Sequence, residues 1–502
     1  MGYNVRFGGH CLPLSPITMT SQNMLHTTAP RWNFKMNGLC LAAALSATAW
    51  LAGCATSDDT FRPAAQVAAA PSVISGVQEV SLAAPTGKTD DLYDQLYPFY
   101  AEPCAVSEIN KKPGFGAAIN GGFGGHSVLY LNGVCRVTDA GYPTIKICDG
   151  EAPGTRGVGL SVNDHFKNTN WVATEGKDFL FYGSLDPNAQ VTQAGYRQTQ
   201  AQAMKMGILD GVKFHERFFD KMPPGMSRRE YMYEISVATD YAINFGRDRY
   251  CARVPMSRDQ MSRVVNYLNQ LNDPYRTGQR HFQWDVLSNN CSHMTHNALA
   301  AAGIWQPVDV DEPFFMSAFD FPVPKNEFVN LMRRTNDLPL DDLLALYRDE
   351  GARAKLLADG RLPMRAGGLA EVAPVIPKND LYETRSRLIF YDPLGRYQRD
   401  FKAILADPRY LDLRTNLTYF AALYQRIAAA RKPLDWYLDH SDRIPAPGPA
   451  QFALFYQRFY QSIDRESAAI DAKLATLNRG IDHSQPVMLS SSTSSMLPSH
   501  TP

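Results

Sequence analysis

The chain has 502 residues, of which 45% are hydrophobic and 20% are charged. This composition can bury a sizeable core, so it excludes disordered and fibrous proteins, and the length predicts two or three domains. Lysine plus arginine equals aspartate plus glutamate at 50 each. The charge balance therefore indicates neither a nucleic-acid-binding surface nor an acidic solvating tail.

An apolar run near the N-terminus predicts an export signal. Residues 39–52 follow Arg31 and Lys35, and they are too few to span a bilayer, which needs about 20, but suit the apolar core of a signal peptide. The run ends in Leu-Ala-Gly followed by Cys54. This ending resembles the lipobox of bacterial lipoproteins, in which the chain is cut before the cysteine and the cysteine is lipidated. The resemblance implies that residues 1–53 are a signal peptide.

The same resemblance predicts a place in the cell envelope. Ala55, and not aspartate, follows the cysteine, which by resemblance to Gram-negative lipoproteins implies anchoring at the periplasmic face of the outer membrane. Residues 54–90 are rich in small residues and proline, as in a flexible tether. Residues 1–30 do not resemble the start of a signal peptide, so translation is also compatible with a later start, at one of three methionines: Met19, Met24 or Met36.

Residues 91–323 carry the pattern of an α+β domain. Short runs of alternating or β-prone residues, separated by Gly, Asn and Asp turns, predict an antiparallel sheet. The predicted strands are 126–132, 144–148, 157–162, 171–174, 178–183 and 248–254, with a bent strand or hairpin within 230–244. A helical insertion is predicted at about 192–222, and Ser257 with Gln260 forms a capping box that begins a further helix.

Residues 324–481 change to a helical composition. Aromatic and leucine side chains recur there at helical spacing and predict a core, not a binding face. Residues 482–502 are rich in serine and proline and predict a disordered tail. We therefore expect a mainly α-helical C-terminal region after the α+β domain.

The most informative stretch is 289–293, Asn-Asn-Cys-Ser-His, which leads into a helix of small residues. Asn290 is placed to cap this helix and Gly303 to end it. Cys291 then lies in the first turn, where unpaired amides and the helix dipole favour a thiolate. The alternative is a small buried core cysteine.

Counting cysteines supports a free thiol at this position. Behind Cys54 the chain carries five cysteines, an odd number, so in an oxidising compartment at least one cannot pair within the monomer. Cys135 and Cys148 lie on two predicted neighbouring strands, and Cys104 with Cys251 is the remaining match. That pairing leaves Cys291 free, although four cysteines allow three connectivities.

A nucleophilic thiol needs a base, and histidine is the usual one. His126 opens a predicted strand far from Cys291 in the sequence, whereas His293 and His296 share the cysteine's own helix. The other candidate histidines are His165, His215 and His281. A metal site is an alternative for Cys291, His293, His296 and His281, but their spacing is not that of a common zinc finger.

Two short motifs resemble a known family. A Gly-Gly-His at 124–126 begins the first sheet strand and an Asn-Cys at 290–291 begins a helix, as in the circularly permuted papain-like proteins, which include relatives of NlpC-type cell-wall peptidases and of lecithin retinol acyltransferase. The resemblance covers about 90–310. It implies Cys291 as nucleophile and His126 as the imidazole that activates it.

The resemblance also implies supporting groups. The Cys291 amide with Asn289 or Asn290 is expected to bind the oxyanion, and a polar group on a later strand is expected to orient the imidazole. His165 is favoured for that role over three neighbours in the sequence: Asp164, Asn163 and Ser161.

Together these features predict a lipid-anchored periplasmic cysteine hydrolase or acyltransferase acting on an amide or an ester. The location favours murein stem peptide or a lipid acyl chain as substrate, and no cofactor, metal or nucleic acid is expected. The alternative is a non-enzymatic envelope lipoprotein that uses the papain-like domain as a binding scaffold.

Overall fold

The computed structural model describes residues 87–117, 120–121, 125–148, 157–285, 289–305, 323–362, 364–385, 392 and 395–482. All of them belong to the compact unit that extends from Cys54 to Pro502. The expected signal peptide, the lipidation site, most of the expected tether and residues 483–502 lie outside the described residues. Within the described part of the chain, no helix is long and apolar enough to cross a membrane.

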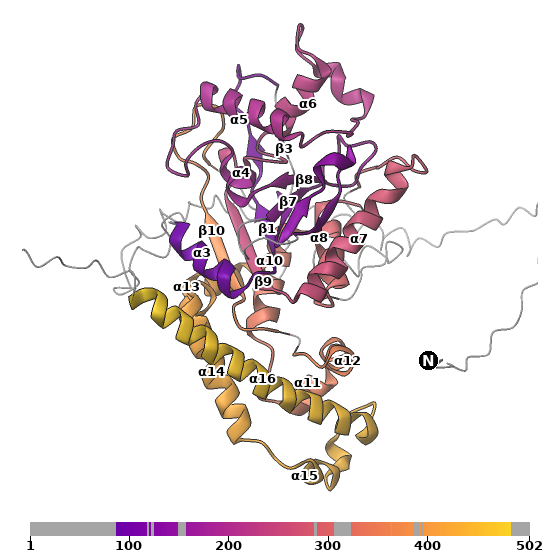
Figure 1. The fold of residues 1–502 in the computed structure, drawn as a ribbon, viewed down its shortest axis with the longest axis vertical. Helices are drawn as coiled ribbons and strands as arrows, with labels where there is room; N and C mark the ends of the chain where they lie inside the picture. The colour runs from indigo at the N-terminus through magenta and orange to yellow at the C-terminus, as the bar shows by residue number, and fades with distance from the viewer. Residues whose placement is uncertain are drawn as a thin grey trace, which may run out of the picture. The chain divides into compact units, whose positions relative to one another are not determined.

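A six-stranded antiparallel sheet lies at the centre of the fold (Figure 1), with the strand order β10-β9-β1-β4-β7-β8. Its strands are β1 (Tyr100–Val106), β4 (His126–Asn132), β7 (Gly157–Ser161), β8 (Val172–Glu175), β9 (Arg249–Pro255) and β10 (Leu369–Ala373). Two short ribbons pair β2 (Ile109–Asn110) with β3 (Asn120–Gly121) and β5 (Val134–Arg136) with β6 (Ile145–Ile147). The expected α+β class with an antiparallel sheet is confirmed.

The helices fall into two groups. Those that precede residue 323 are α3 (Gly87–Leu96), α4 (Lys177–Tyr182), α5 (Gln193–Met206), α6 (Arg228–Ser236), α7 (Arg258–Arg276) and α8 (Cys291–Ala301). Those that follow are α10 (Pro324–Asn336), α11 (Leu343–Arg348), α12 (Glu350–Asp359), α13 (Arg396–Ala406), α14 (Leu413–Ala429), α15 (Leu434–Leu438) and α16 (Pro449–Asp482). The expected helical C-terminal region is therefore present.

Helices pack on both faces of the sheet. On one face, the Ser127 hydroxyl of β4 lies 3.3 Å from the Thr295 hydroxyl of α8. On the other face, the Leu180 side chain of α4 fills the space above Gly159 of β7, so closely that a Cβ at Gly159 would overlap it. The α8 face and the α4 face are therefore distinct, and each strand residue belongs to one or the other.

Two segments with strand composition are helical. Residues 178–183 lie mostly in α4, and the first part of 230–244 lies in α6. Ser227 caps α6, accepting a hydrogen bond from the Glu230 amide while the Glu230 carboxylate accepts one from the Ser227 amide. This capping box, and for α4 the packing over Gly159, outweigh the β-propensity of the aromatic residues, because propensity differences are small beside packing.

Two strands of the sheet were not predicted. β1 is fully buried and central, yet it contains Glu102 and Pro103, residue types that argue against a central strand. β10 lies C-terminal to residue 323 and pairs with β9, with Leu369 opposite Arg253. The sheet therefore crosses the domain boundary expected at 323, and α10 also packs against β1 and β9.

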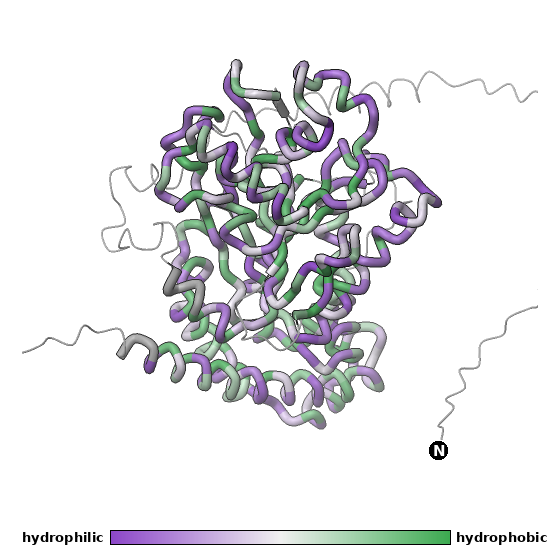
Figure 2. The backbone as a smooth tube through the Cα atoms, turned by 45° about the horizontal axis from the view of Figure 1, so that its top comes forward, coloured by the Kyte–Doolittle hydropathy of each residue, from purple (hydrophilic) through white to green (hydrophobic). Residues whose placement is uncertain are grey.

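A second hydrophobic core lies in the C-terminal helices. Leu417 and Phe420 of α14 and Phe455 and Phe459 of α16 are completely buried in it. Figure 2 shows hydrophobic and hydrophilic residues alternating along the long helix α16, as expected for a helix with one buried side. The aromatic residues at helical spacing are thus core residues.

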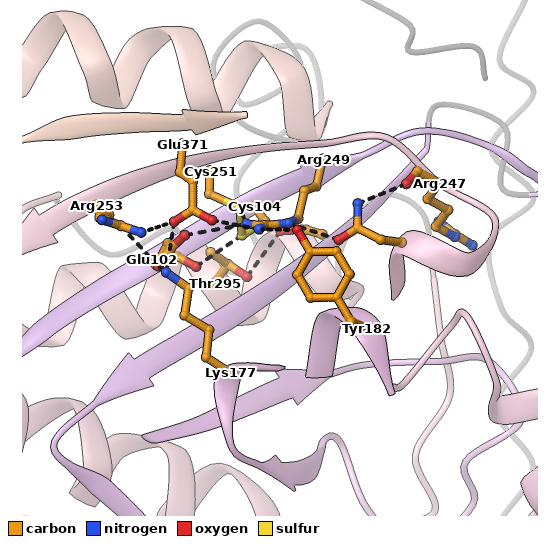
Figure 3. The surroundings of a disulfide bond; sticks show 12 residues. Glu102, Cys104, Lys177, Tyr182, Arg247, Arg249, Cys251, Arg253, Thr295 and Glu371 are labelled. Atoms are coloured by element: carbon orange, nitrogen blue, oxygen red, sulfur yellow. Dashed lines mark hydrogen bonds and ion pairs between the residues drawn. A yellow bond between two sulfur atoms is a disulfide. The ribbon is translucent and has the colours of Figure 1, made fainter. Parts of the chain in front are cut away.

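Buried charges surround a disulfide between the neighbouring strands β1 and β9 (Figure 3). Cys104 of β1 is bonded to Cys251 of β9, and the cluster beside it consists of Glu102, Lys177, Arg249, Arg253 and Glu371. The Lys177 ammonium of α4 lies 2.9 Å from Glu102 and 2.7 Å from Glu371 of β10. The cluster therefore ties β1, β9, β10 and α4 together.

The two disulfides are expected to contribute unequally to stability. Cys104–Cys251 closes a separation of 147 residues and Cys135–Cys148 one of 13. From chain entropy, the double replacement Cys104→Ala with Cys251→Ala should lower the free energy of unfolding by about 5 kcal/mol, and Cys135→Ala with Cys148→Ala by about 3 kcal/mol. Urea unfolding of the three proteins measures the difference. An equal or reversed order would contradict it.

Candidate functional site

Cys291 lies at the first residue of α8, as the sequence indicates. The side-chain oxygen of Asn290 accepts hydrogen bonds from the amides of Ser292 and His293, at 2.9 and 3.2 Å, and Gly303 follows the helix with a φ of 74°. Cys291 is 7% exposed, and its thiol is free. The disulfides are the two pairs that the sequence analysis favoured.

The sulfur of Cys291 reaches the start of strand β4. The Ser127 amide donates a hydrogen bond to Sγ over 3.3 Å, joining residues 164 apart in the sequence. Ser127 lies one residue beyond the last pair of the β4–β7 ladder, Val128 with Ser161. The thiol therefore sits next to the backbone of His126.

The His126 side chain points to the α4 face. Its Nε2 lies 3.0 Å from Oγ of Ser161, and Ser161 donates its own proton to the Thr239 carbonyl over 3.0 Å. Since the Ser127 hydroxyl is on the α8 face, strand alternation places the neighbouring imidazole on the opposite side. Among the hydrogen bonds between described residues, none joins Cys291 Sγ to the His126 ring.

Ser161 determines the tautomer of His126. A hydroxyl has one proton to donate, and Ser161 gives it to the Thr239 carbonyl, so its oxygen accepts from Nε2–H of His126. The neutral ring then carries its proton on Nε2 and leaves Nδ1 as the basic nitrogen. Of the four candidates for orienting the imidazole, Ser161 is the one in hydrogen-bond contact with it.

His165 lies one step further away. Its Nε2 is 3.4 Å from Oδ2 of Asp240, and its ring packs against Phe214 with centroids 4.3 Å apart. Asn163 donates to both Ser161, over 3.2 Å, and Asp240. A polar chain thus leads from His126 through Ser161 and Asn163 to Asp240 and His165.

Burial keeps the thiol and the imidazole neutral at neutral pH. It raises the pKa of Cys291, against the opposing effects of the Ser127 and Ser292 amides and the positive charge of Arg247. Burial, assisted by the same Arg247 charge, lowers the pKa of His126 to about 3. The resting site is therefore a thiol beside a neutral imidazole, not a preformed ion pair.

Asp240 and Arg247 are site residues that no sequence motif marks. Asp240 is fully buried, and although burial alone would raise its pKa, hydrogen bonds and the charge of His165 lower it. Arg247 is 4% exposed and lies just before β9. An aspartate within a predicted strand or hairpin and an arginine just before the next strand are common in any protein, so only the fold distinguishes these two.

Asn289 and Asn290 hold the loop in place. The Asn289 amide donates to the Gln283 carbonyl over 2.9 Å, and its oxygen accepts from Asn170 over 3.2 Å. The Asn290 oxygen is used for the helix cap. The remaining donor expected for an oxyanion is the backbone amide of Cys291, and this amide makes a hydrogen bond with the sulfur of the same residue.

The histidines of the alternative metal site have other surroundings. Nδ1 of His296 lies 3.2 Å from Glu327, and its ring stacks on Trp305 with centroids 5.5 Å apart. His281 is exposed. The one group of metal-type ligands that comes together among the described residues contains Cys104 and Cys251, whose sulfurs are bonded to each other.

A cavity of about 550 Å³ opens elsewhere, between α5 and α6. Its lining includes Arg197, Met204, Pro223 and Glu230, and neither Cys291 nor His126 contributes to it. The candidate site is therefore a buried cluster at the end of the sheet.

Comparison of the chain with models of protein families, with curated proteins and with solved structures finds no match. The chemistry of the site therefore has to be argued from its own geometry.

The buried imidazole should make stability depend on pH. An unfolded histidine, with a pKa of about 6.5, takes up a proton as the pH falls, whereas His126, with its pKa near 3, does not. Between pH 7.5 and 5 this linkage should cost the folded state about 2 kcal/mol. His126→Asn should remove that part of the pH dependence in urea unfolding, and the exposed His281→Asn should not. An unchanged slope in His126→Asn would show that the imidazole takes up its proton in the folded state at the same pH as in the unfolded state.

Proposed function

We propose that this protein is a cysteine hydrolase or acyltransferase with Cys291 as nucleophile and His126 as its proton acceptor. The observation that carries the proposal is the hydrogen bond from the Ser127 amide to Cys291 Sγ, which joins the start of α8 to the start of the histidine strand. A helix N-terminus favours the thiolate, and the neighbouring residue supplies a neutral imidazole with a basic Nδ1.

The permuted papain-like architecture belongs to the same proposal. The order of the elements supports it, since the histidine strand β4 precedes the cysteine helix α8 and the two make contact. Ser161 then takes the part of the polar group that orients the imidazole. His165 would act on it only through Asp240 and Asn163.

The reaction proceeds in two balanced steps. In the first, the thiol proton moves to Nδ1 of His126, Sγ bonds to the substrate carbonyl carbon, and the leaving amine or alcohol departs with that proton. In the second, water or an acceptor hydroxyl attacks the thioester, its proton passes through the imidazole to Sγ, and the free thiol is restored. Among the described residues no hydrogen bond joins the His126 ring to the sulfur, so the first transfer requires rotation of the His126 side chain or a bridging water.

The cellular setting is part of the proposal as well. The lipobox at Cys54 supports a lipid-anchored protein on the periplasmic face of the outer membrane, and the two disulfides suit an oxidising compartment. Murein stem peptides and lipid acyl chains are the amide and ester substrates that this location provides.

A second candidate is a binding scaffold without catalysis. The burial of the Cys291 thiol and the hydrogen bond of His126 to Ser161 favour it, since both groups are then satisfied without a substrate. The two functions differ in whether the thiol reacts with small electrophiles.

Cys291→Ala should abolish alkylation by iodoacetamide at this position and hydrolysis of p-nitrophenyl acyl esters, with a rate loss of at least about 1,000-fold. His126→Ala should lower the rate by about 100- to 10,000-fold, as expected for loss of a general base. Alkylation is measured by mass spectrometry of the Cys291 peptide. A thiol that resists iodoacetamide in the folded wild-type protein would favour the scaffold.

The Ser161→Ala variant tests whether Ser161 fixes the tautomer and orientation of the His126 ring. Loss of the hydroxyl should lower kcat by about tenfold with KM nearly unchanged, because a transition-state interaction is weakened while substrate contacts stay. His165→Gln should have a smaller effect. If instead His165→Gln is the more damaging change, His165 and not Ser161 would be the orienting group.

A further inference from the structure

Arg247 is a buried cation at the sheet end where the Cys291 thiol lies. Its Nη1 donates to the Ser107 carbonyl over 3.0 Å, and Ser107 directly follows Val106, which lies opposite His126 in the β1–β4 register. The guanidinium is therefore at the same end of the sheet as His126 and Cys291. Its charge acts on both groups, lowering the pKa of each.

This guanidinium has no ion-pair partner among the described residues. Nε of Arg247 is buried without a hydrogen bond, and the carboxylate of Asp240 is bonded to Asn163 and lies near His165 instead. A buried charge that lacks a partner is costly. The other arginines near β9 show the contrast, since Arg249 and Arg253 both pair with Glu371.

The Arg247 side chain is not part of the charge cluster around the disulfide. Figure 3 shows its side chain turned away from the charge cluster around the disulfide, while its backbone carbonyl accepts from Asn244. The guanidinium is planar and offers several donors in a fixed fork, which matches the two oxygens of a carboxylate.

We propose that Arg247 binds a carboxylate of the substrate beside Cys291, so that the enzyme acts on acyl compounds with a carboxylate near the scissile carbonyl. This inference rests on the proposed function of Cys291. It favours anionic substrates, such as peptides cut next to a free carboxyl group, over neutral acyl esters.

Two alkylating reagents of nearly equal size test this. Iodoacetate carries a carboxylate and iodoacetamide does not, and in both cases the thiolate displaces iodide. The rates are measured by mass spectrometry of the Cys291 peptide from the full-length, non-reduced protein. The ratio of the two rates cancels any change in the thiolate fraction, and a small blocked cysteine amide supplies the reference ratio.

We expect the wild-type ratio of iodoacetate to iodoacetamide to exceed the reference by about tenfold or more, as for attraction by one nearby charge. Arg247→Gln should bring it to the reference, whereas Arg247→Lys should keep most of the preference. The matched control is Arg399→Gln, which makes the same change of net charge at an exposed site on α13.

A reactive thiol with the reference ratio in the wild type, or an unchanged ratio in Arg247→Gln, would overturn the inference and leave Cys291 as nucleophile. A thiol that reacts with neither reagent would overturn the proposed function, and the inference with it. If Arg247→Gln does not fold, the wild-type protein still decides: acetate should protect Cys291 from iodoacetamide and neutral acetamide should not, and equal effects of the two would refute carboxylate binding.

Discussion

The pairing of β1 with β4 on one side and β9 on the other is the constraint on which the rest of the structure depends. β4 and β9 both run antiparallel to β1, so the end of β1 and the starts of β4 and β9 lie together at one end of the sheet. His126 opens β4 there, and Arg247 lies two residues before the start of β9. The candidate site is assembled from these strand ends and the first turn of α8.

The same pairing explains why charged residues are tolerated in the centre of the fold. Glu102 in β1 is completely buried, and it is compensated by Lys177 from α4 and by the arginines of β9. Glu371 of β10 completes the cluster. Since removal of one partner from a buried ion pair leaves an uncompensated charge, this cluster makes the docking of β10 and α4 part of the stability of the central strands.

The electrostatics of the site differ from those of the cluster. Around the disulfide, each of the three cations lies within ion-pair distance of a carboxylate. At the sheet end, the Cys291 thiol and the His126 imidazole are buried and neutral, and the Arg247 charge has no ion-pair partner among the residues that the structure describes. This arrangement is therefore able to stabilise negative charge, either on the sulfur as a thiolate forms or on a carboxylate that binds there. A fixed positive charge acts more strongly where water is excluded.

The sequence by itself determined the local features. The strand at 126–132, the Asn290 cap before Cys291 and the capping box at Ser257 were all predictable, because each depends on neighbouring side chains and backbone groups. Only the tertiary structure decided that β1 is central, that 178–183 is helical, and that β10 joins the sheet. It also decided which polar groups meet His126: Ser161 and Thr239 contact the ring, while His165 is held by Asp240. These outcomes depend on register and on the face to which each side chain points, and both are set by contacts between separate segments of the chain, such as His126 with Ser161 and Ser127 with Cys291.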